Sequence, residues 1–169
     1  WDRIPATERP PEGPVWTSTD EANPPPEVRW LGHSGFVIRW KGQQVLLDPN
    51  TSGRCTVACR VLEPAADVAD LGRVDAVVIS HAHRDHLDLA TLRRLSEVSH
   101  VIVPLGADVY FKPSEWARTS IDPIEAGQCQ SLGALEICGV PAQHNGNRDH
   151  PFTSHIHALG TIIRSTSHP

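Results

Sequence analysis

Short runs of β-branched and aromatic residues alternate with glycine-bearing turns near the start of the sequence. The runs cover residues 28–31, 36–40 and 44–47. Runs of this length, bounded by turn residues, are typical of short strands joined by hairpins. We expect a β-meander whose strands form one antiparallel sheet with an apolar face turned inward.

After residue 73 the pattern changes to strands that alternate with a helical periodicity. Residues 74–79 form a nearly continuous apolar run, and residues 101–104 form another. Between them, Asp88 is a candidate helix N-cap, followed by apolar residues at helical spacing: Leu89, Leu92, Leu95 and Val98. Weaker signals indicate a short helix or irregular excursion over residues 64–71 and a second short helix over residues 107–112. Two further strands are indicated over residues 135–140 and 159–164. Alternating strands and helices favour an α/β layer architecture.

Proline is concentrated at the N-terminal end. Residues 1–27 contain seven of the fifteen prolines. Proline lacks a backbone N–H and fixes φ, so this density excludes a regular helix or a central strand there. We expect an extended arm over residues 1–27 and a single domain over residues 28–169.

Net charge and the lengths of the apolar stretches limit which partners and which cellular location are expected. The net charge of −5 is not that of a nucleic-acid-binding protein, which would carry a basic patch. No apolar stretch approaches the ~20 residues of a membrane span, and no signal-peptide core is visible, so a cytoplasmic location is expected. The sequence contains no Met and begins with Trp1, from which we expect that residues preceding it are not represented.

The four cysteines are Cys55, Cys59, Cys129 and Cys138. None forms a Cys-x-x-Cys pair, so neither a zinc ribbon nor a thioredoxin-like motif is indicated. Cys55 and Cys59 have the spacing of a disulfide or of additional metal ligands. The expectation for all four is a role as small, partly buried side chains.

The residues with the clearest chemistry follow the apolar run that ends at Ile79. His81, His83, Asp85 and His86 lie within six positions, in the stretch Ser80-His81-Ala82-His83-Arg84-Asp85-His86. Imidazole and carboxylate groups hold Zn²⁺, iron or manganese at neutral pH. Two pairs of such ligands at adjacent points suit a two-metal centre. The alternative is a polar loop with chance histidines.

Other candidates occur at the ends of other predicted strands. His144 follows the strand predicted near residues 135–140, and a second strand end is the kind of element that closes a coordination shell. Asp48 ends an earlier strand, where its carboxylate can orient a metal ligand. His33, between two glycines at a strand junction, is expected to be a structural hydrogen-bonding residue, with a role in the site as the alternative. His155 and His157 are weaker candidates for binding metal or substrate.

These motifs resemble the metallo-β-lactamase superfamily. His81-Ala82-His83-Arg84-Asp85-His86 has the H-x-H-x-D-H signature of that family, and His144 follows at a later strand end. Trp30-Leu31-Gly32-His33-Ser34-Gly35, Leu47-Asp48-Pro49 and Pro141-Ala142-Gln143-His144 are similar to the branch of N-acyl-phosphatidylethanolamine-hydrolysing phospholipase D and the ascorbate-6-phosphate lactonases. The resemblance covers roughly residues 28–164 and implies an αββα sandwich.

The resemblance also implies a function, which the fold alone does not. His81, His83 and His144 would bind one divalent metal, and Asp85 and His86 a second, with two zinc ions expected and manganese or iron as alternatives. A metal-bound hydroxide would attack an ester or phosphodiester, with Asp85 accepting a proton. The substrate would be a small-molecule or lipid-like ester, in a phosphodiesterase or lactonase reaction. The alternative is a non-catalytic metal-binding or interaction module.

One departure from the family concerns the second half of the fold. Family members carry a bridging aspartate and a final histidine, and nothing after His144 matches either one. We therefore expect an incomplete sandwich, the N-terminal half only, with five of the seven ligands and a sheet that lacks its packing partner. A fragment, self-association or a partner chain that completes the fold, and a reduced relative are the alternatives.

Overall fold

The computed structural model describes residues 24–55, 58–60, 62–148 and 156–166. Most of the expected arm, residues 1–23, lies outside the described residues, as do His155 and the segment around it. At the boundary, Trp40 Nε1 donates a hydrogen bond to the Pro24 carbonyl at 3.2 Å. In the described part of the chain, no helix is long and apolar enough to cross a membrane.

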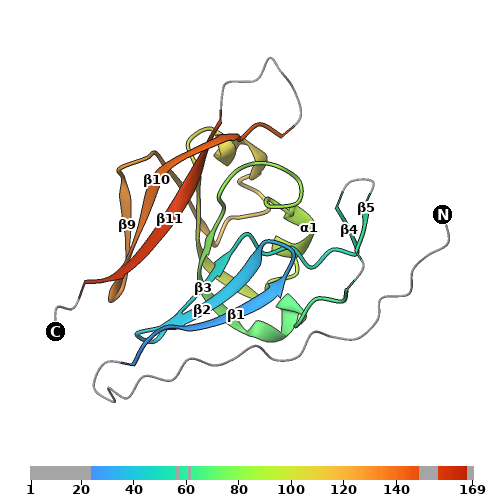
Figure 1. The fold of residues 1–169 in the computed structure, drawn as a ribbon, viewed down its shortest axis with the longest axis horizontal. Coiled ribbons are helices and arrows are strands. Elements are labelled where there is room, and N and C mark those ends of the chain that lie inside the picture. The colour runs from blue at the N-terminus through green and yellow to red at the C-terminus, as the bar shows by residue number, and fades with distance from the viewer. Residues whose placement is uncertain (1–23, 56–57, 61, 149–155, 167–169) are drawn as a thin grey trace.

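The expected β-meander forms the first part of the fold (Figure 1). Its strands are β1 (Glu27–Gly32), β2 (Gly35–Trp40) and β3 (Gln43–Leu47), paired antiparallel through two tight turns. The first turn contains Gly32 at φ 108° and His33 at φ 53°, so the chain reverses through two left-handed residues. The alternation of apolar and polar residues thus predicts this hairpin pair correctly.

Three parallel strands extend this sheet in the order β1-β2-β3-β6-β7-β8. They are β6 (Arg73–Val78), β7 (Glu97–Pro104) and β8 (Ser120–Ile124), and each is parallel to its neighbour. The six-stranded sheet is therefore mixed. The apolar pattern does not predict β8, because Asp122 and Pro123 interrupt it. The edge position of β8 tolerates that proline.

Among the described residues, the helices in the connections between the parallel strands are only short turns. They are η1 (Val68–Leu71), α1 (Leu89–Leu92) and η2 (Ala107–Tyr110). Asp88 caps α1 as expected, since its carboxylate accepts a hydrogen bond from the Ala90 backbone N–H at 3.2 Å. The predicted helix through Val98 is wrong, because α1 ends after one turn. Val98 instead lies in β7, opposite Val74 of β6.

A second, three-stranded sheet contains β9 (Cys129–Leu132), β10 (Leu135–Asn145) and β11 (His157–Ser165) in the antiparallel order β11-β10-β9. A separate two-stranded ribbon pairs β4 (Arg54–Cys55) with β5 (Ala58–Cys59). In Figure 1, β9–β11 lie to one side of β1–β3. The expectation of a sheet without a packing partner is therefore wrong.

The two faces of the large sheet bury separate clusters. One face packs on the small sheet through the following side chains: Val45, Ala76, Val78, Ile102, Ile124, Leu132, Leu135, Ile137 and Leu159. The opposite face packs on α1, η2 and the loop after β6 through Leu46, Val77, Leu87, Leu92, Val101, Ala107 and Phe111. The layers are thus helical turns, large sheet and small sheet. This accords with a sandwich.

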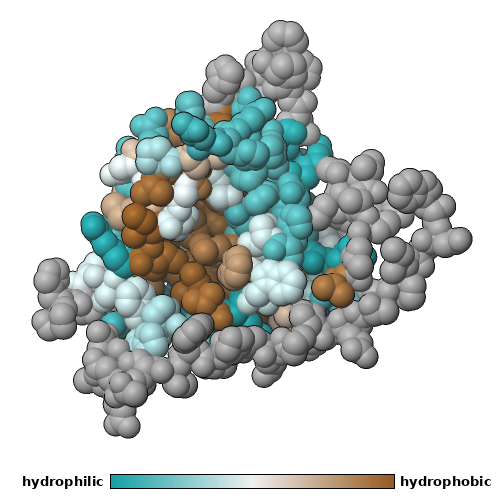
Figure 2. Space-filling model, viewed as in Figure 1, coloured by the Kyte–Doolittle hydropathy of each residue, from teal (hydrophilic) through white to brown (hydrophobic). Residues whose placement is uncertain are grey.

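The small sheet leaves part of the large sheet uncovered. Val28, Trp30 and Phe36 are 49%, 39% and 37% exposed. Val28 pairs with Ile38, and Trp30 with Phe36, so these side chains share the face on which Ile38 packs against the inter-sheet cluster. Figure 2 shows hydrophobic residues gathered on the surface between the two sheets. We call Val28, Trp30 and Phe36 the apolar strip.

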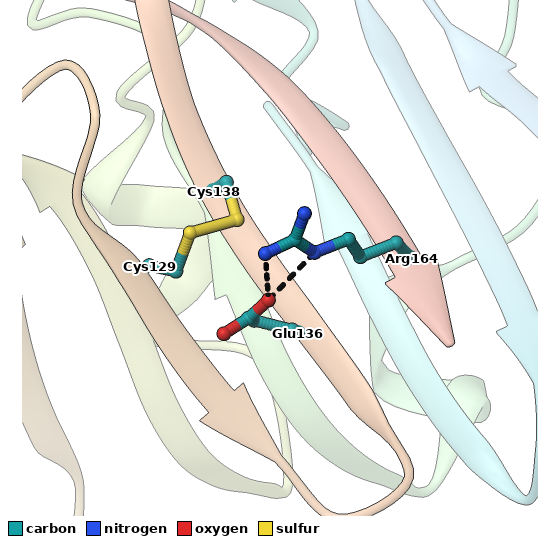
Figure 3. The surroundings of a disulfide bond; sticks show 4 residues. All are labelled: Cys129, Glu136, Cys138 and Arg164. Carbon is teal, nitrogen blue, oxygen red and sulfur yellow. Dashed lines mark hydrogen bonds and ion pairs between the residues drawn. A yellow bond between two sulfur atoms is a disulfide. The ribbon is translucent and has the colours of Figure 1, made fainter. Parts of the chain in front are cut away.

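A disulfide joins Cys129 to Cys138 across β9 and β10 (Figure 3). The two cysteines occupy directly opposed positions of the ladder. Beside them, Glu136 on β10 accepts a hydrogen bond from Arg164 Nε on β11 at 2.6 Å. The expectation that all four cysteines are unlinked small side chains is wrong for this pair. Sequence spacing did not show that a hairpin would bring them together.

Candidate metal centre

The candidate site lies where the parallel strands of the large sheet end. Beyond β6, Ile79 N–H donates to the Ile102 carbonyl at 2.9 Å, which continues the ladder, and residues 80–86 then form a loop. The small sheet holds this loop from the other side. Ala82 N–H donates to Gly146, and Leu159 N–H donates to Ser80, at 3.0 and 2.9 Å. Both sheets therefore fix the loop that carries the histidines.

A first group of potential ligands contains His81, His83 and His144. His83 Nδ1 lies 3.0 Å from His81 Nε2 and 3.3 Å from His144 Nε2, and one nitrogen of each side chain lies within 4.8 Å of the others. His81 is buried, His83 is half-buried and His144 is exposed. The site therefore opens to solvent on the β10 side.

A second group contains His33, Asp85 and His86. Asp85 Oδ2 lies 3.1 Å from His33 Nε2 and 3.7 Å from His86 Nε2. The rings of His81 and His86 are 4.0 Å apart, centroid to centroid, so the two groups are adjacent. All five residues predicted as ligands converge here. Their binding of metal stays a prediction.

Asp48 connects the two groups. Its side chain accepts hydrogen bonds from Ser80 N–H at 2.7 Å, Ser80 Oγ at 2.6 Å and His86 Nδ1 at 2.8 Å. Ser80 Oγ also lies 2.9 Å from His81 Nδ1. The Nδ1–H of His86 is thus committed to Asp48, which leaves Nε2 to face Asp85. Asp48 occupies the orienting position expected of it. The part played by Ser80 was not predicted, although it directly precedes His81.

The surroundings of His81 and His86 shift the pKa values of the two side chains in opposite directions. Burial, followed by the neighbouring His86, His83 and His144, lowers the pKa of His81 to about 4 against an opposing effect of Asp48. Burial also acts to lower the pKa of His86, but its hydrogen bond and charge interaction with Asp48, together with Asp85, raise that pKa above its usual value. His81 is therefore neutral at pH 7, which is the form that ligates a metal.

The carboxyl group of Asp85 stays ionised. Burial acts to raise its pKa, but the hydrogen bond from His33, a backbone hydrogen bond and the charges of His86 and His33 together lower it. An ionised carboxylate beside imidazole side chains fits a divalent cation. Zinc, iron and manganese all accept such a donor set.

The remaining histidine candidates lie outside both groups. His157 is opposite Asn145 at the end of β10, exposed, and belongs to neither ligand group among the described residues. His155 lies outside the described residues. His33 lies in the second ligand group, although the sequence pattern favoured only a structural role for it. The sequence feature that could have indicated its place in the site is the Gly32-His33-Ser34-Gly35 turn.

An apolar groove of about 810 Å³, whose walls also include Asp108, Glu125 and His157, lies between η2 and the strands β10 and β11. Its walls come from the ends of β7 and β8 and from β10 and β11, and they include Leu105, Val109, Pro141, Ala142 and Leu159. Leu105 and Val109 are 52% and 73% exposed. Pro141 and Ala142 precede His144 by three and two positions, so the groove borders the strand that carries His144.

Comparison with known proteins identifies the family. Residues 43–169 match the model of the beta-lactamase superfamily domain. An uncharacterized protein of Mycobacterium tuberculosis (strain ATCC 25618 / H37Rv) is 34% identical over 128 residues, which cover 72% of this chain. The chain therefore belongs to the metallo-β-lactamase superfamily.

Two further relatives have more informative names. A UPF0173 metal-dependent hydrolase of Caldivirga maquilingensis is 24% identical over 82% of this chain. N-acyl-phosphatidylethanolamine-hydrolyzing phospholipase D 1 of Caenorhabditis elegans is 28% identical over 77% of it. The matches cover 34% of the mycobacterial protein, 54% of the archaeal one and 40% of the nematode one. The chain thus spans between a third and about half of the length of these relatives.

The fold is similar to that of solved metallohydrolases. The structure of Igni18, a metallo hydrolase from Ignicoccus hospitalis, aligns with a TM-score of 0.57 and 22% sequence identity, over 82% of this chain and 55% of that one. This similarity concerns the fold alone, and it agrees with the sandwich described above.

Proposed function

We propose that the protein is a metal-dependent hydrolase that cleaves an ester or phosphodiester bond, in a reaction of the phosphodiesterase or lactonase type. The observation that carries the proposal is the convergence of two ligand groups at the ends of β6 and β10. The family membership and the named hydrolase relatives support the reaction class. An unmetallated polar loop would not require these side chains to converge.

The residues divide into holding and orienting roles. His81, His83 and His144 would hold one divalent cation, and Asp85 and His86 a second. Bound cations would lower the pKa of a coordinated water and polarise the substrate oxygen. Asp85, whose lowered pKa keeps it ionised, would receive a proton from the attacking water. Asp48 and Ser80 keep the rings of His86 and His81 in position.

The apolar groove supports a substrate with a hydrocarbon portion. Leu105 and Val109 expose apolar surface beside the strand of His144, where the alkyl part of a lipid-like ester would be removed from water. A small polar ester would leave that surface unused. We propose zinc as the metal, with iron or manganese as alternatives that the donor set equally accepts.

Hydrolysis assays on metal-loaded protein test this function. The substrates are an aryl phosphodiester, a lactone and p-nitrophenyl esters of increasing chain length. His81→Ala and His83→Ala are expected to abolish turnover. His100→Ala is the matched control, because His100 bonds to Asp122 in β8 and lies in neither ligand group. Unchanged turnover in the His81 and His83 variants would refute the proposal.

A non-catalytic metal-binding module is the second candidate. It is favoured by the finding that the two ligand groups share no residue among those described, so no bridging carboxylate was found between them. This candidate predicts tight binding of one structural ion, a lower melting temperature after chelation, and no turnover on any of the substrates above.

A further inference from the structure

We infer that His33 is a third protein ligand of the second cation, which it holds together with Asp85 and His86. The three side chains come from two separate elements, the β1–β2 turn and the loop after β6. One ligand atom of each lies within 4.8 Å of the other two. The family resemblance assigned only Asp85 and His86 to this cation, so His33 completes a set that the chain supplies itself.

Two of the three distances between these atoms are close to those of a coordination sphere. Zinc ligands at about 2.0–2.1 Å in a tetrahedral arrangement lie roughly 3.4 Å from one another. The distances from Asp85 Oδ2 to His33 Nε2 and His86 Nε2 are 3.1 and 3.7 Å, on either side of that value. His33 also lies beside His86, with the two ring centroids 6.0 Å apart.

The β1–β2 turn is built to present His33 at this point. His33 adopts a left-handed φ of 53°, which is uncommon for a residue other than glycine. Its carbonyl accepts a hydrogen bond from Trp30 Nε1 at 2.9 Å, which holds the turn in place. Strain of this kind persists where the surrounding structure requires the residue, and it clusters at functional sites.

The partners of His33 are fixed independently. The Asp85 carbonyl accepts hydrogen bonds from Asn50 Nδ2 at 3.1 Å and Ser34 Oγ at 3.4 Å. His86 donates its Nδ1–H to Asp48, so Nε2 remains for a cation. Two imidazoles and one carboxylate on one side leave open positions for water and substrate. This donor set suits zinc or non-haem iron(II).

Metal titration of the 169-residue chain tests the inference without an activity measurement. The protein is stripped with chelator and dialysed, and zinc and cobalt(II) are added in separate experiments. The bound ions are counted by elemental analysis and native mass spectrometry. The wild-type chain is expected to bind two ions. His33→Asn is expected to bind the second at least about tenfold more weakly and to lose its cobalt(II) d–d absorption, while the first ion is retained.

The variants are chosen to separate ligation from folding. Asparagine tolerates a left-handed φ, so His33→Asn preserves the turn while removing the imidazole. His86→Ala should reproduce the loss of the second ion, and His100→Ala should bind two ions. Ser34→Ala removes a contact to Asp85 but no ligand, so it should keep the cobalt spectrum of the wild type.

Two outcomes would overturn the inference. One is a wild-type chain that binds a single ion. The other is a His33→Asn variant whose second ion binds with unchanged affinity, or with an unchanged cobalt(II) spectrum, as a purely hydrogen-bonding His33 predicts. Because neither readout depends on turnover, a chain that binds two ions and catalyses nothing would refute the proposed hydrolase and leave His33 as a ligand.

Discussion

His86 Nδ1 lies 2.8 Å from Asp48 Oδ2, and this contact joins residues 38 positions apart in the sequence. Asp48 directly follows β3, whereas His86 lies in the loop after β6. Because β3 and β6 are parallel neighbours, their carboxyl ends meet at one edge of the sheet. The contact therefore depends on strand order, and it selects the tautomer in which His86 Nε2 is free to bind a metal.

We predict that Asp48→Asn weakens metal binding. The amide cannot match the carboxylate as acceptor for both Ser80 and His86, so the ring of His86 loses its orientation. Loss of such an outer partner costs about 10–100-fold in metal affinity. Competition with a chromophoric chelator measures this change. Asp122→Asn is the matched control, because Asp122 makes the same 2.8 Å contact with His100 away from the centre. Equal effects of the two substitutions would contradict the assigned role.

The histidines of the chelated protein are predicted to titrate far apart. The pKa of His81 is lowered to about 4, whereas that of His86 is raised. Imidazole ¹⁵N chemical shifts followed by NMR from pH 3 to pH 9 should show His81 neutral down to about pH 4. His86 should remain protonated above its ordinary range. A His81 midpoint near 6.5 would contradict the effect assigned to its burial.

These two shifts affect stability with opposite signs. The unfolded chain protonates His81 at a higher pH than the folded chain does, so stability is expected to fall as the pH decreases from about 6.5 to about 4. His86 binds its proton more tightly when folded, so its contribution is present below pH 6.5 and is lost as the pH rises through its raised pKa. Urea unfolding of the chelated His81→Ala variant across this range should lack the acidic decline that the parent shows.

Reduction of the Cys129–Cys138 disulfide is predicted to destabilise the fold and to leave the metal centre intact. The bond closes a loop of nine residues, for which chain entropy gives about 2–3 kcal/mol. The melting temperature should therefore fall by several degrees in reductant or in the Cys129→Ser/Cys138→Ser variant, which serves as the control for reductant effects. Loss of bound metal on reduction would show that the far end of β10 is coupled to His144.

Self-association remains a prediction, and the apolar strip is the surface that fits it. Val28, Trp30 and Phe36 place exposed apolar area on one face of a sheet edge, and burial of such area favours association. Sedimentation velocity should show a concentration-dependent dimer that Val28→Ser/Phe36→Ser weakens. Val109→Ser, exposed on another surface, should leave the dimer unchanged. A monomer at all concentrations would refute the prediction.

The sequence predicted what local patterns encode. The β-meander, the Asp88 cap and the convergence of His81, His83, Asp85, His86 and His144 follow from alternation, capping and spacing. The predictions were wrong where contacts with distant parts of the chain determine the local structure. Val98 fits a helical spacing, but it pairs with Val74 because β6 supplies a ladder. The Cys129–Cys138 pairing and the His33–Asp85 contact depend on strand register and on a turn, which single residues do not reveal.

The central claim is that His81, His83 and His144 hold a divalent cation, and zinc binding to the chelated protein tests it most directly. Calorimetric titration combined with elemental analysis should show at least one tightly bound zinc ion in the wild-type protein, with a higher melting temperature on loading. His83→Ala should lose that ion, and His100→Ala should keep it. A wild-type chain that binds no zinc, iron or manganese, or a His83→Ala variant that binds metal as tightly as the parent, would contradict the account.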